Sequence, residues 1–260
     1  MREFGGRLTL LGLATVLVGA CATSGSVGDG STVLRVGVTP TYPPIVFKQG
    51  PQLAGVEVDL ASQLGPRLHR TVQFIELGWD EQIPALVAGT IDIIMSGMSI
   101  TQARQVRIAF TQSYLQTGLF AGFRAQDKTR YASRESILNA SGTVGVIEGT
   151  TGDVFVQRNM PYARRVAFSQ ASDAARGLRQ LTIDLFLHDG PSIAWQVSTY
   201  EAELAAFPQP LTQESLAWGV RRDDTELLLQ VNAVLAEWKG DGTLNRILGK
   251  WLPSWELSRP

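Results

Sequence analysis

The spacing of hydrophobic residues along the first part of the chain changes repeatedly between a pattern typical of strands and one typical of helices. Residues 32–39, "TVLRVGVT", and 71–77, "TVQFIEL", are rich in β-branched residues and predict strands. Between them, Val58, Ala61 and Leu64 recur at helical spacing, and Gly65-Pro66 predicts an end or a kink of that helix. Residues 79–89 predict a short helix with Asp80 as its N-cap. The run "IDIIMSG" then lacks alternation, as is typical of a parallel strand covered on both faces.

The same succession begins again in the second half. Residues 142–149 predict a strand that ends in glycine, and "TTGDVFVQRNM" predicts a helix. "RVAFS", "ASDAARGLRQL" and 183–190, "IDLFLHDG", follow as strand, helix and buried strand. Residues 211–255 predict one strand and two amphipathic helices. Two successive units of this kind indicate an α/β protein with two lobes.

The N-terminus differs from the rest. Arg2 and Arg7 precede an apolar stretch, Leu8–Ala20, which is shorter than the ~20 residues that a spanning helix needs. This pattern predicts a secretory signal. Cys21, the only cysteine, permits two interpretations: "VGAC" is similar to a bacterial lipobox, whereas "ACA" fits a cleavage site that removes the cysteine. We favour lipidation of Cys21, because residues 22–32 consist mainly of small and polar residues, as in a flexible tether.

Composition narrows the classes of function. The 260 residues carry a formal net charge of -1, and 44% are hydrophobic, as is ordinary for a globular protein. Such a balance gives no electrostatic basis for binding nucleic acid. His69 and His188 are the only histidines, so we expect no metal site, and no motif indicates a cofactor.

Three loops follow predicted strands and carry candidate binding groups. In "SGMSITQAR", Gly97 permits close approach to the backbone, Ser99 and Thr101 offer hydroxyls, and Arg104 offers a fork of donors suited to a carboxylate. By itself this stretch is equally compatible with a surface turn. Ligands of open α/β sheets bind beyond the carboxyl ends of the strands, which is where these loops fall.

The two other loops belong to the second unit. In "EGTTGD", Thr150 and Thr151 open a helix, whose free N–H groups suit an anion, although a plain helix cap is an alternative. Neither a dinucleotide fingerprint nor a P-loop is present there. In "HDGPS", Asp189 is a candidate partner for an ammonium group or a helix cap. Together the loops supply donors for a carboxylate and an acceptor for an ammonium, as a zwitterionic ligand requires.

Several segments in order resemble the periplasmic solute-binding proteins for polar amino acids, family 3, the extracellular components of ABC importers. They are "LRVGVTPTYPPIVFKQG", "GVEVDLASQL", "IPALVAGTIDIIMSGMSITQAR", "VGVIEGTTGD", "IDLFLHDGPS" and "VNAVLAEWKGDGTLNRILGKW", and they span about Val33 to Trp255. The resemblance implies a two-lobed periplasmic-binding-protein (Venus-flytrap) fold, in which each lobe is a mixed, mostly parallel sheet flanked by helices. It further implies a signal peptide over 1–21, lobe 1 over 33–123 and 216–256, lobe 2 over 124–215, and crossovers near 120–127 and 211–218.

The resemblance also implies a site for an amino acid. Its ligand-binding residues would be Tyr42 and Trp79 as aromatic walls, Gly97 as a backbone donor, Ser99, Arg104 as the carboxylate clamp, Thr150 or Thr151, and Asp189 for the ammonium. Thr39 stands where many relatives have an acid. His188 stands where a small apolar residue is expected, and we assign this histidine a structural role.

The implied function is capture of a polar amino acid by a monomeric lipoprotein. The expected partners are the amino acid, an ABC permease of the cytoplasmic membrane, and the membrane itself through the lipid anchor, in the periplasm or at the cell surface. We expect no catalysis. The alternatives are an enzyme similar to cyclohexadienyl dehydratase, disfavoured because "EGTTGD" lacks the pattern Gly-Gly-Thr-Asn, and a sensory amino-acid-binding protein.

Overall fold

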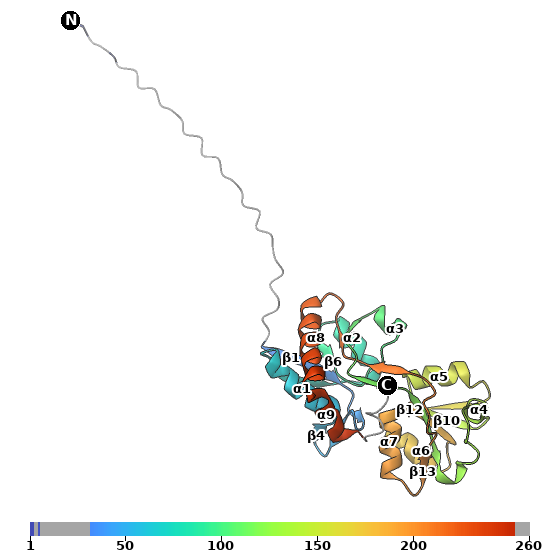
Figure 1. The fold of residues 1–260 in the computed structure, drawn as a ribbon. Coiled ribbons are helices and arrows are strands. Elements are labelled where there is room, and N and C mark those ends of the chain that lie inside the picture. The colour runs from blue at the N-terminus through green and yellow to red at the C-terminus, as the bar shows by residue number, and fades with distance from the viewer. Residues whose placement is uncertain (3–4, 6–31, 253–260) are drawn as a thin grey trace. The chain divides into compact units, whose positions relative to one another are not determined.

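The structure, a computed structural model, describes residues 1–2, 5 and 32–252. The chain divides into a short unit, Met1–Gly30, and a large unit, Ser31–Pro260, which contains the described helices and strands. Within the large unit two mixed sheets, each flanked by helices, form two lobes (Figure 1). The α/β class and the two-lobed architecture expected from the sequence are confirmed.

Lobe 1 is built on a five-stranded sheet of order β5-β1-β6-β15-β7. The strands β5, β1 and β6 run parallel, whereas β15 is antiparallel to both of its neighbours. Its strands are β1 (Val33–Val38), β5 (Thr71–Glu76), β6 (Ile93–Ile94), β7 (Ala109–Phe110) and β15 (Gly219–Val220). A hairpin sheet follows β1 and consists of β2 (Thr41–Tyr42), β3 (Val46–Gln49) and β4 (Gln52–Ala54). The helices are α1 (Val56–Arg67), the 3₁₀ turn η1 (Trp79–Glu81), α2 (Gln82–Val87), α3 (Gln102–Gln105), α8 (Thr225–Gly240) and α9 (Thr243–Trp251).

Lobe 2 repeats the plan with the order β11-β10-β12-β9-β13. The first three strands run parallel, and β9 is antiparallel to β12 and to β13. Its strands are β9 (Leu119–Arg124), β10 (Thr143–Ile147), β11 (Arg164–Phe168), β12 (Leu185–Asp189) and β13 (Leu204–Ala206). The helices are the 3₁₀ turn η2 (Ala125–Asp127), α4 (Arg134–Leu138), α5 (Thr151–Asn159), α6 (Ala171–Arg179) and α7 (Gly190–Thr199).

Two antiparallel strands connect the lobes. β8 (Leu115–Thr117) leads into lobe 2, and β14 (Glu214–Leu216) leads back to lobe 1. The predicted boundary at residues 123 and 124 needs correction, because β9 begins at Leu119 and pairs with β12 of lobe 2. Sequence alone does not show this, since β9 is as apolar as a strand of either sheet.

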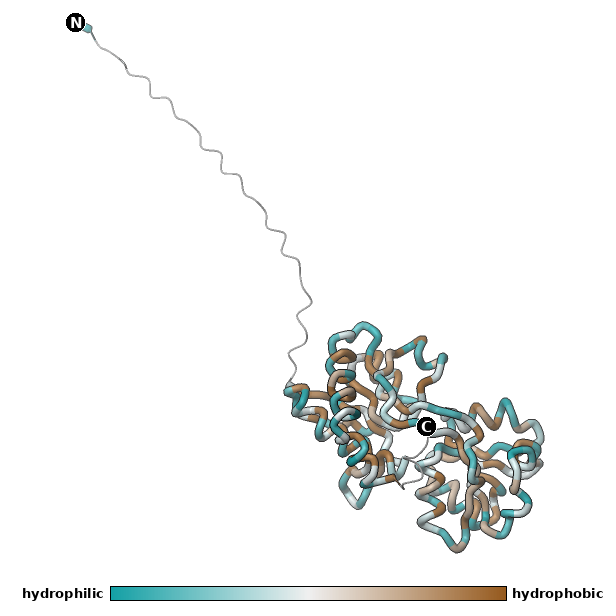
Figure 2. Tube along the Cα trace, viewed as in Figure 1, coloured by the Kyte–Doolittle hydropathy of each residue, from teal (hydrophilic) through white to brown (hydrophobic). Residues whose placement is uncertain are grey.

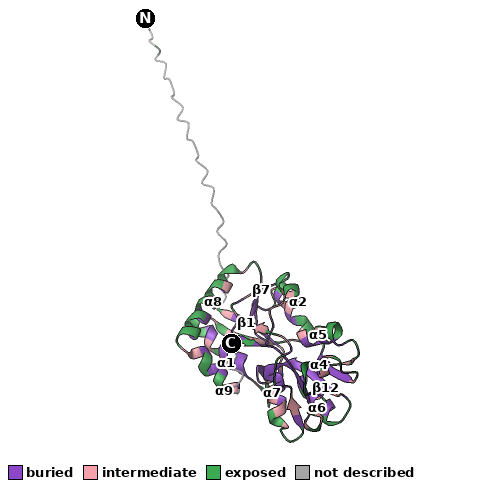
Figure 3. Ribbon diagram, turned by 45° about the vertical axis from the view of Figure 1, so that its right-hand side comes forward, coloured by how far each residue is buried: buried purple, intermediate pink, exposed green. Residues whose placement is uncertain are grey.

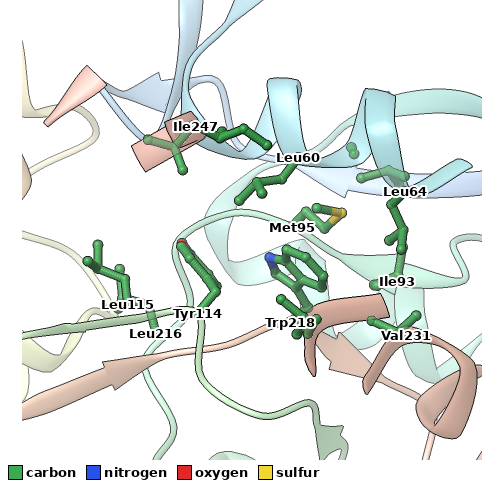
Figure 4. Packing of buried hydrophobic residues seen from close by; sticks show 14 of the residues in the cluster. Leu60, Leu64, Ile93, Met95, Tyr114, Leu115, Leu216, Trp218, Val231 and Ile247 are labelled. Carbon is green, nitrogen blue, oxygen red and sulfur yellow. The ribbon is translucent and has the colours of Figure 1, made fainter. Parts of the chain in front are cut away.

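Each lobe has its own buried core. In lobe 1, Leu60, Met95, Tyr114 and Trp218 meet between the sheet and the helices (Figure 4). Hydrophobic segments gather inside the lobes, whereas hydrophilic residues follow the outer loops (Figure 2). Burial follows the same division, with buried central strands and exposed outer faces on helices such as α8 and α2 (Figure 3). Burial of this apolar surface is the main driving force for the folding of each lobe.

The helix α1 continues to Arg67, past the Gly65-Pro66 pair that predicted its end or a kink. Pro66 lies in the last turn, and the missing Cβ of Gly65 removes part of the clash that proline imposes on its predecessor. Asp80 likewise lies inside η1 rather than at its cap, because Gly78 precedes the turn.

Candidate functional site

A cleft of about 660 Å³ lies between the lobes, and residues of both line it. It opens where β1, β6, β10 and β12 end, as expected for ligand sites of α/β sheets. The eight binding residues predicted from the sequence all line this cleft: Tyr42, Trp79, Gly97, Ser99, Arg104, Thr150, Thr151 and Asp189. Residues far apart in the sequence therefore meet here: Tyr42 and Asp189, separated by 147 positions, form a hydrogen bond.

Arg104 is held in place by its own loop. The short helix α3 begins after Thr101, whose hydroxyl accepts from the Arg104 N–H at 3.3 Å. The guanidinium lies over the ring of Trp79, 5.1 Å from its centre, and donates through Nη1 to the Ser99 carbonyl at 2.8 Å. Burial lowers the pKa of Arg104, while Asp189 and Glu214 oppose that effect. Since no other protein acceptor is recorded for it among the described residues, its remaining N–H groups are available to a ligand carboxylate.

Asp189 ends β12 and faces lobe 1. It occupies the cap position of α7 without capping it through its side chain; instead, it accepts a hydrogen bond from the Tyr42 hydroxyl at 2.6 Å. Burial raises the pKa of Asp189 to about 6, against the lowering effects of Tyr42 and Arg104. The carboxyl is therefore mostly ionised at pH 7, with a cation on the opposite wall of the cleft.

Glu214, which the sequence did not single out, joins the lobes beside this site. Its Oε2 accepts from the Ser99 hydroxyl of lobe 1 at 2.5 Å and from the Thr151 hydroxyl of lobe 2 at 2.9 Å. Burial and the nearby Asp189 raise the pKa of Glu214. No local signal marks this acid, because its position depends on the bridge between Ser99 and Leu216 in the connecting strand.

Gly97 has a different role from the one expected. Its N–H donates to Oε2 of Glu57 at 2.7 Å, so this amide is not available as a ligand donor. Its φ is +65°, and a Cβ would lie 2.5 Å from the ring of Tyr42. Only glycine therefore lets the Tyr42 ring lie against this loop.

The remaining predicted residues divide by what their polar atoms do. Thr150 caps α5 by accepting from the Asp153 N–H at 3.4 Å and donates its hydroxyl to Ile147 O at 2.7 Å. Thr151, by contrast, donates its hydroxyl to Glu214 in the connecting strand β14. The indole N–H of Trp79 reaches Gly149 O in the other lobe at 3.1 Å. Both threonine hydroxyls thus donate to protein acceptors, Thr150 within its own turn and Thr151 to the connecting strand.

The family model for bacterial extracellular solute-binding proteins, family 3, matches residues 34–254. The chain belongs to this family. Individual relatives agree with that assignment. The histidine-binding periplasmic protein of Salmonella typhimurium is 30% identical over 259 residues, which cover 93% of this chain and 95% of the relative.

A second relative is the putative ABC transporter arginine-binding protein 2 of Escherichia coli, which is 28% identical and covers 84% of this chain and 90% of its own length. Among solved structures, an ancestral amino acid-binding protein described as a precursor of cyclohexadienyl dehydratase superposes with a TM-score of 0.80. It is 30% identical and covers 85% of this chain and 96% of its own. These family members are thus binding proteins for amino acids, and ABC transporters and the periplasm appear in their names.

Apart from residues 1–2 and 5, the predicted signal peptide lies outside the described residues, and so does Cys21. Within the described part of the chain, no helix combines the length and the apolar character that crossing a membrane requires.

Proposed function

We propose that this protein is an extracytoplasmic substrate-binding protein that encloses a polar amino acid between its lobes and delivers it to an ABC importer. The observation that carries the proposal is the pairing of opposite charges across one cleft. Arg104 offers free guanidinium donors on one wall, and Asp189 offers a carboxylate on the other. A zwitterion needs both partners, because burying either of its charges alone costs several kcal/mol.

In the proposed mechanism, lobe 1 receives the carboxylate and closure completes the site. Arg104 binds the α-carboxylate. Ser99 and Thr151 become hydroxyl donors to the ligand by exchanging the hydrogen bonds that both donate to Glu214. Asp189 exchanges its hydrogen bond from Tyr42 for the ligand ammonium. The connecting strands β8 and β14 act as the hinge. Because only contacts that are stronger in the closed form drive closure, groups from both lobes must touch the ligand.

Thermal unfolding with a panel of amino acids tests this proposal. A ligand present at 100 times its Kd stabilises the folded state by about 2.7 kcal/mol, which raises the midpoint measurably. Arg104→Ala should abolish the shift, whereas Arg107→Ala, an exposed arginine next to the same helix, should retain it. A panel that shifts no midpoint in the wild-type protein, or a full shift in Arg104→Ala, would contradict the assignment.

We further propose that Cys21 is lipidated and anchors the protein in the periplasm or at the cell surface. The small polar residues 22–32 would then serve as the tether. Mass spectrometry of the membrane-extracted protein should show an acylated N-terminal cysteine. A soluble mature protein that begins after Cys21 would identify the alternative cleavage.

Binding without catalysis is the role that we assign. The dehydratase alternative predicts conversion of prephenate to phenylpyruvate, and we expect no product above the background rate. Delivery to an importer is tested separately, because deletion of the gene should lower cellular uptake of the amino acid that the panel identifies. Unchanged uptake would instead favour a sensory role.

A further inference from the structure

The wall of the cleft formed by lobe 2 contains a histidine that the zwitterion site does not use. His188 precedes Asp189 on β12 and lies on the same face of the strand as Phe186, with ring centres 5.7 Å apart. That face packs against α6 and α7 through the core around Phe186. From lobe 1, the ring of Tyr42 covers His188 edge-on at 4.9 Å. His188 thus lines the cleft while only 6% of its surface is exposed.

The hydrogen bonds of His188 fix which nitrogen carries the proton. Its Nδ1 accepts from the backbone N–H of Asp189 at 2.8 Å, so Nδ1 carries no hydrogen. Burial lowers the pKa of the His188 ring to about 4, which keeps it neutral at pH 7. A neutral imidazole with an unprotonated Nδ1 has its hydrogen on Nε2. Among the described residues this N–H has no acceptor, and because His188 lines the cleft, the donor is open to a ligand there.

A second set of donors begins on the same side of the sheet. The nine-residue helix α6 starts at Ala171, which lines the cleft together with Gln170. Gln170 occupies the cap position without capping the helix, because its side-chain amide donates to Asp173 Oδ2 at 2.9 Å. Within the described chain, no acceptor is recorded for the N–H groups of Ala171 and Ser172. A helix N-terminus with free N–H groups attracts an acceptor oxygen.

We propose that His188 Nε2–H and the first amides of α6 form a subsite for the carbonyl oxygen of the ligand side chain. The substrate is then an amino acid with a carboxamide side chain, glutamine or asparagine. This inference rests on the proposed function, since it assumes that an amino acid occupies the cleft.

Charge decides between a carboxamide and its competitors. The donors of the subsite are neutral, and Asp189 and Glu214 lie nearby, so a side-chain carboxylate would meet acids without a second cation. Glu148 and Asp80, at the exposed edge of the cleft, add to that repulsion. A guanidinium or ammonium side chain would place donors against donors and leave the His188 N–H unpaired. An amide carbonyl pairs with them at no cost in net charge.

Isothermal titration of the purified protein, refolded to remove bound ligand, tests the subsite. The ligands are glutamine, asparagine, glutamate, arginine, and norvaline, which has the same chain length as glutamine up to the amide. We expect glutamine or asparagine to bind at least tenfold more tightly than norvaline, glutamate or arginine. His188→Phe preserves an aromatic ring but removes the donor, and should reduce the preference for glutamine over norvaline to less than threefold. The matched control His69→Phe, at an exposed histidine in lobe 1, should retain the preference.

The outcomes separate the two proposals. Tighter binding of arginine or glutamate than of either amide by the wild-type protein would overturn the subsite and leave the proposed function intact. An unchanged preference in His188→Phe would do the same. Absence of binding for every amino acid would overturn the proposed function and the subsite with it. The comparison of glutamine with norvaline on the wild-type protein decides the matter even where His188→Phe does not fold.

Discussion

Glu57 should make the stability of this protein fall with rising pH in a range where most carboxyl groups have no such effect. The side chain is completely buried under the cleft loop. It accepts from the Gly97 N–H at 2.7 Å and from the Trp218 indole N–H at 3.2 Å. Burial without a cation raises the pKa of Glu57 from 4.5 to about 8. The carboxyl is thus mostly protonated in the folded protein at pH 7.

The raised pKa fixes the sign and the size of the effect. An acid whose pKa is higher in the folded state contributes its full stability below its unfolded pKa, near 4.5, and loses it as the pH rises to about 8. Between these limits, each pH unit removes about 1.4 kcal/mol. From pH 5 to pH 7, Glu57 therefore lowers the free energy of unfolding by about 2–3 kcal/mol.

Urea unfolding of the wild-type protein and of Glu57→Gln at pH 5, 6, 7 and 8 measures this contribution. The variant cannot ionise, so the stability of the wild type relative to Glu57→Gln should decrease by about 2–3 kcal/mol from pH 5 to pH 7. A fixed offset from the lost Trp218 hydrogen bond does not alter that change. Glu201→Gln, at an exposed position, should give a curve parallel to the wild type. Parallel curves for Glu57→Gln as well would refute the protonated state of Glu57.

Three further effects follow from the cleft. Because the pKa of Asp189 is about 6, its carboxyl loses charge as the pH falls below 6. The affinity for a zwitterionic amino acid should therefore drop up to tenfold from pH 6 to pH 5. Titration calorimetry that shows a constant affinity would count against the ammonium assignment. Gly97→Ala should destabilise the protein by about 1–3 kcal/mol and weaken ligand binding, because a Cβ at positive φ meets the Tyr42 ring; a melting curve equal to that of the wild type would contradict this. Glu214→Ala removes the acceptor that Ser99 and Thr151 share, so the cleft of the ligand-free protein should open. X-ray scattering should then show a larger radius of gyration. An unchanged radius would show that these two hydrogen bonds do not hold the lobes together.

Periodicity predicted the strands that frame the cleft because the local sequence alone shows that these strands are buried. The apolar runs of β6 and β12 have no alternation and end in polar residues, so both the strands and the loops after them could be located. Arg104 and Asp189 could be chosen as candidate binding residues because they lie in or beside those loops. The lobe assignment of β9 was not readable in this way, because hydrogen-bond partners rather than composition decide which sheet a strand joins.

Polar contacts over long sequence distances were the part that could not be predicted. Glu214 reaches Ser99 across 115 positions, and Glu57 reaches Gly97 across 40. Gly97 was expected as a backbone donor, but which way its amide points depends on the buried acid beneath it. His188 was assigned a structural role because a lone histidine carries no pattern, and only its neighbours in space reveal an unpaired N–H.

The order in which the lobes can fold follows from the position of β15. This strand lies between β6 and β7, although it comes more than a hundred residues after them in the chain. Lobe 2, from Leu119 to Ala206, is a continuous segment whose sheet needs nothing outside itself. Lobe 1 can complete its sheet only after residues 219–220 have been synthesised or translocated. A chain that emerges from its N-terminus is therefore expected to fold lobe 2 before lobe 1.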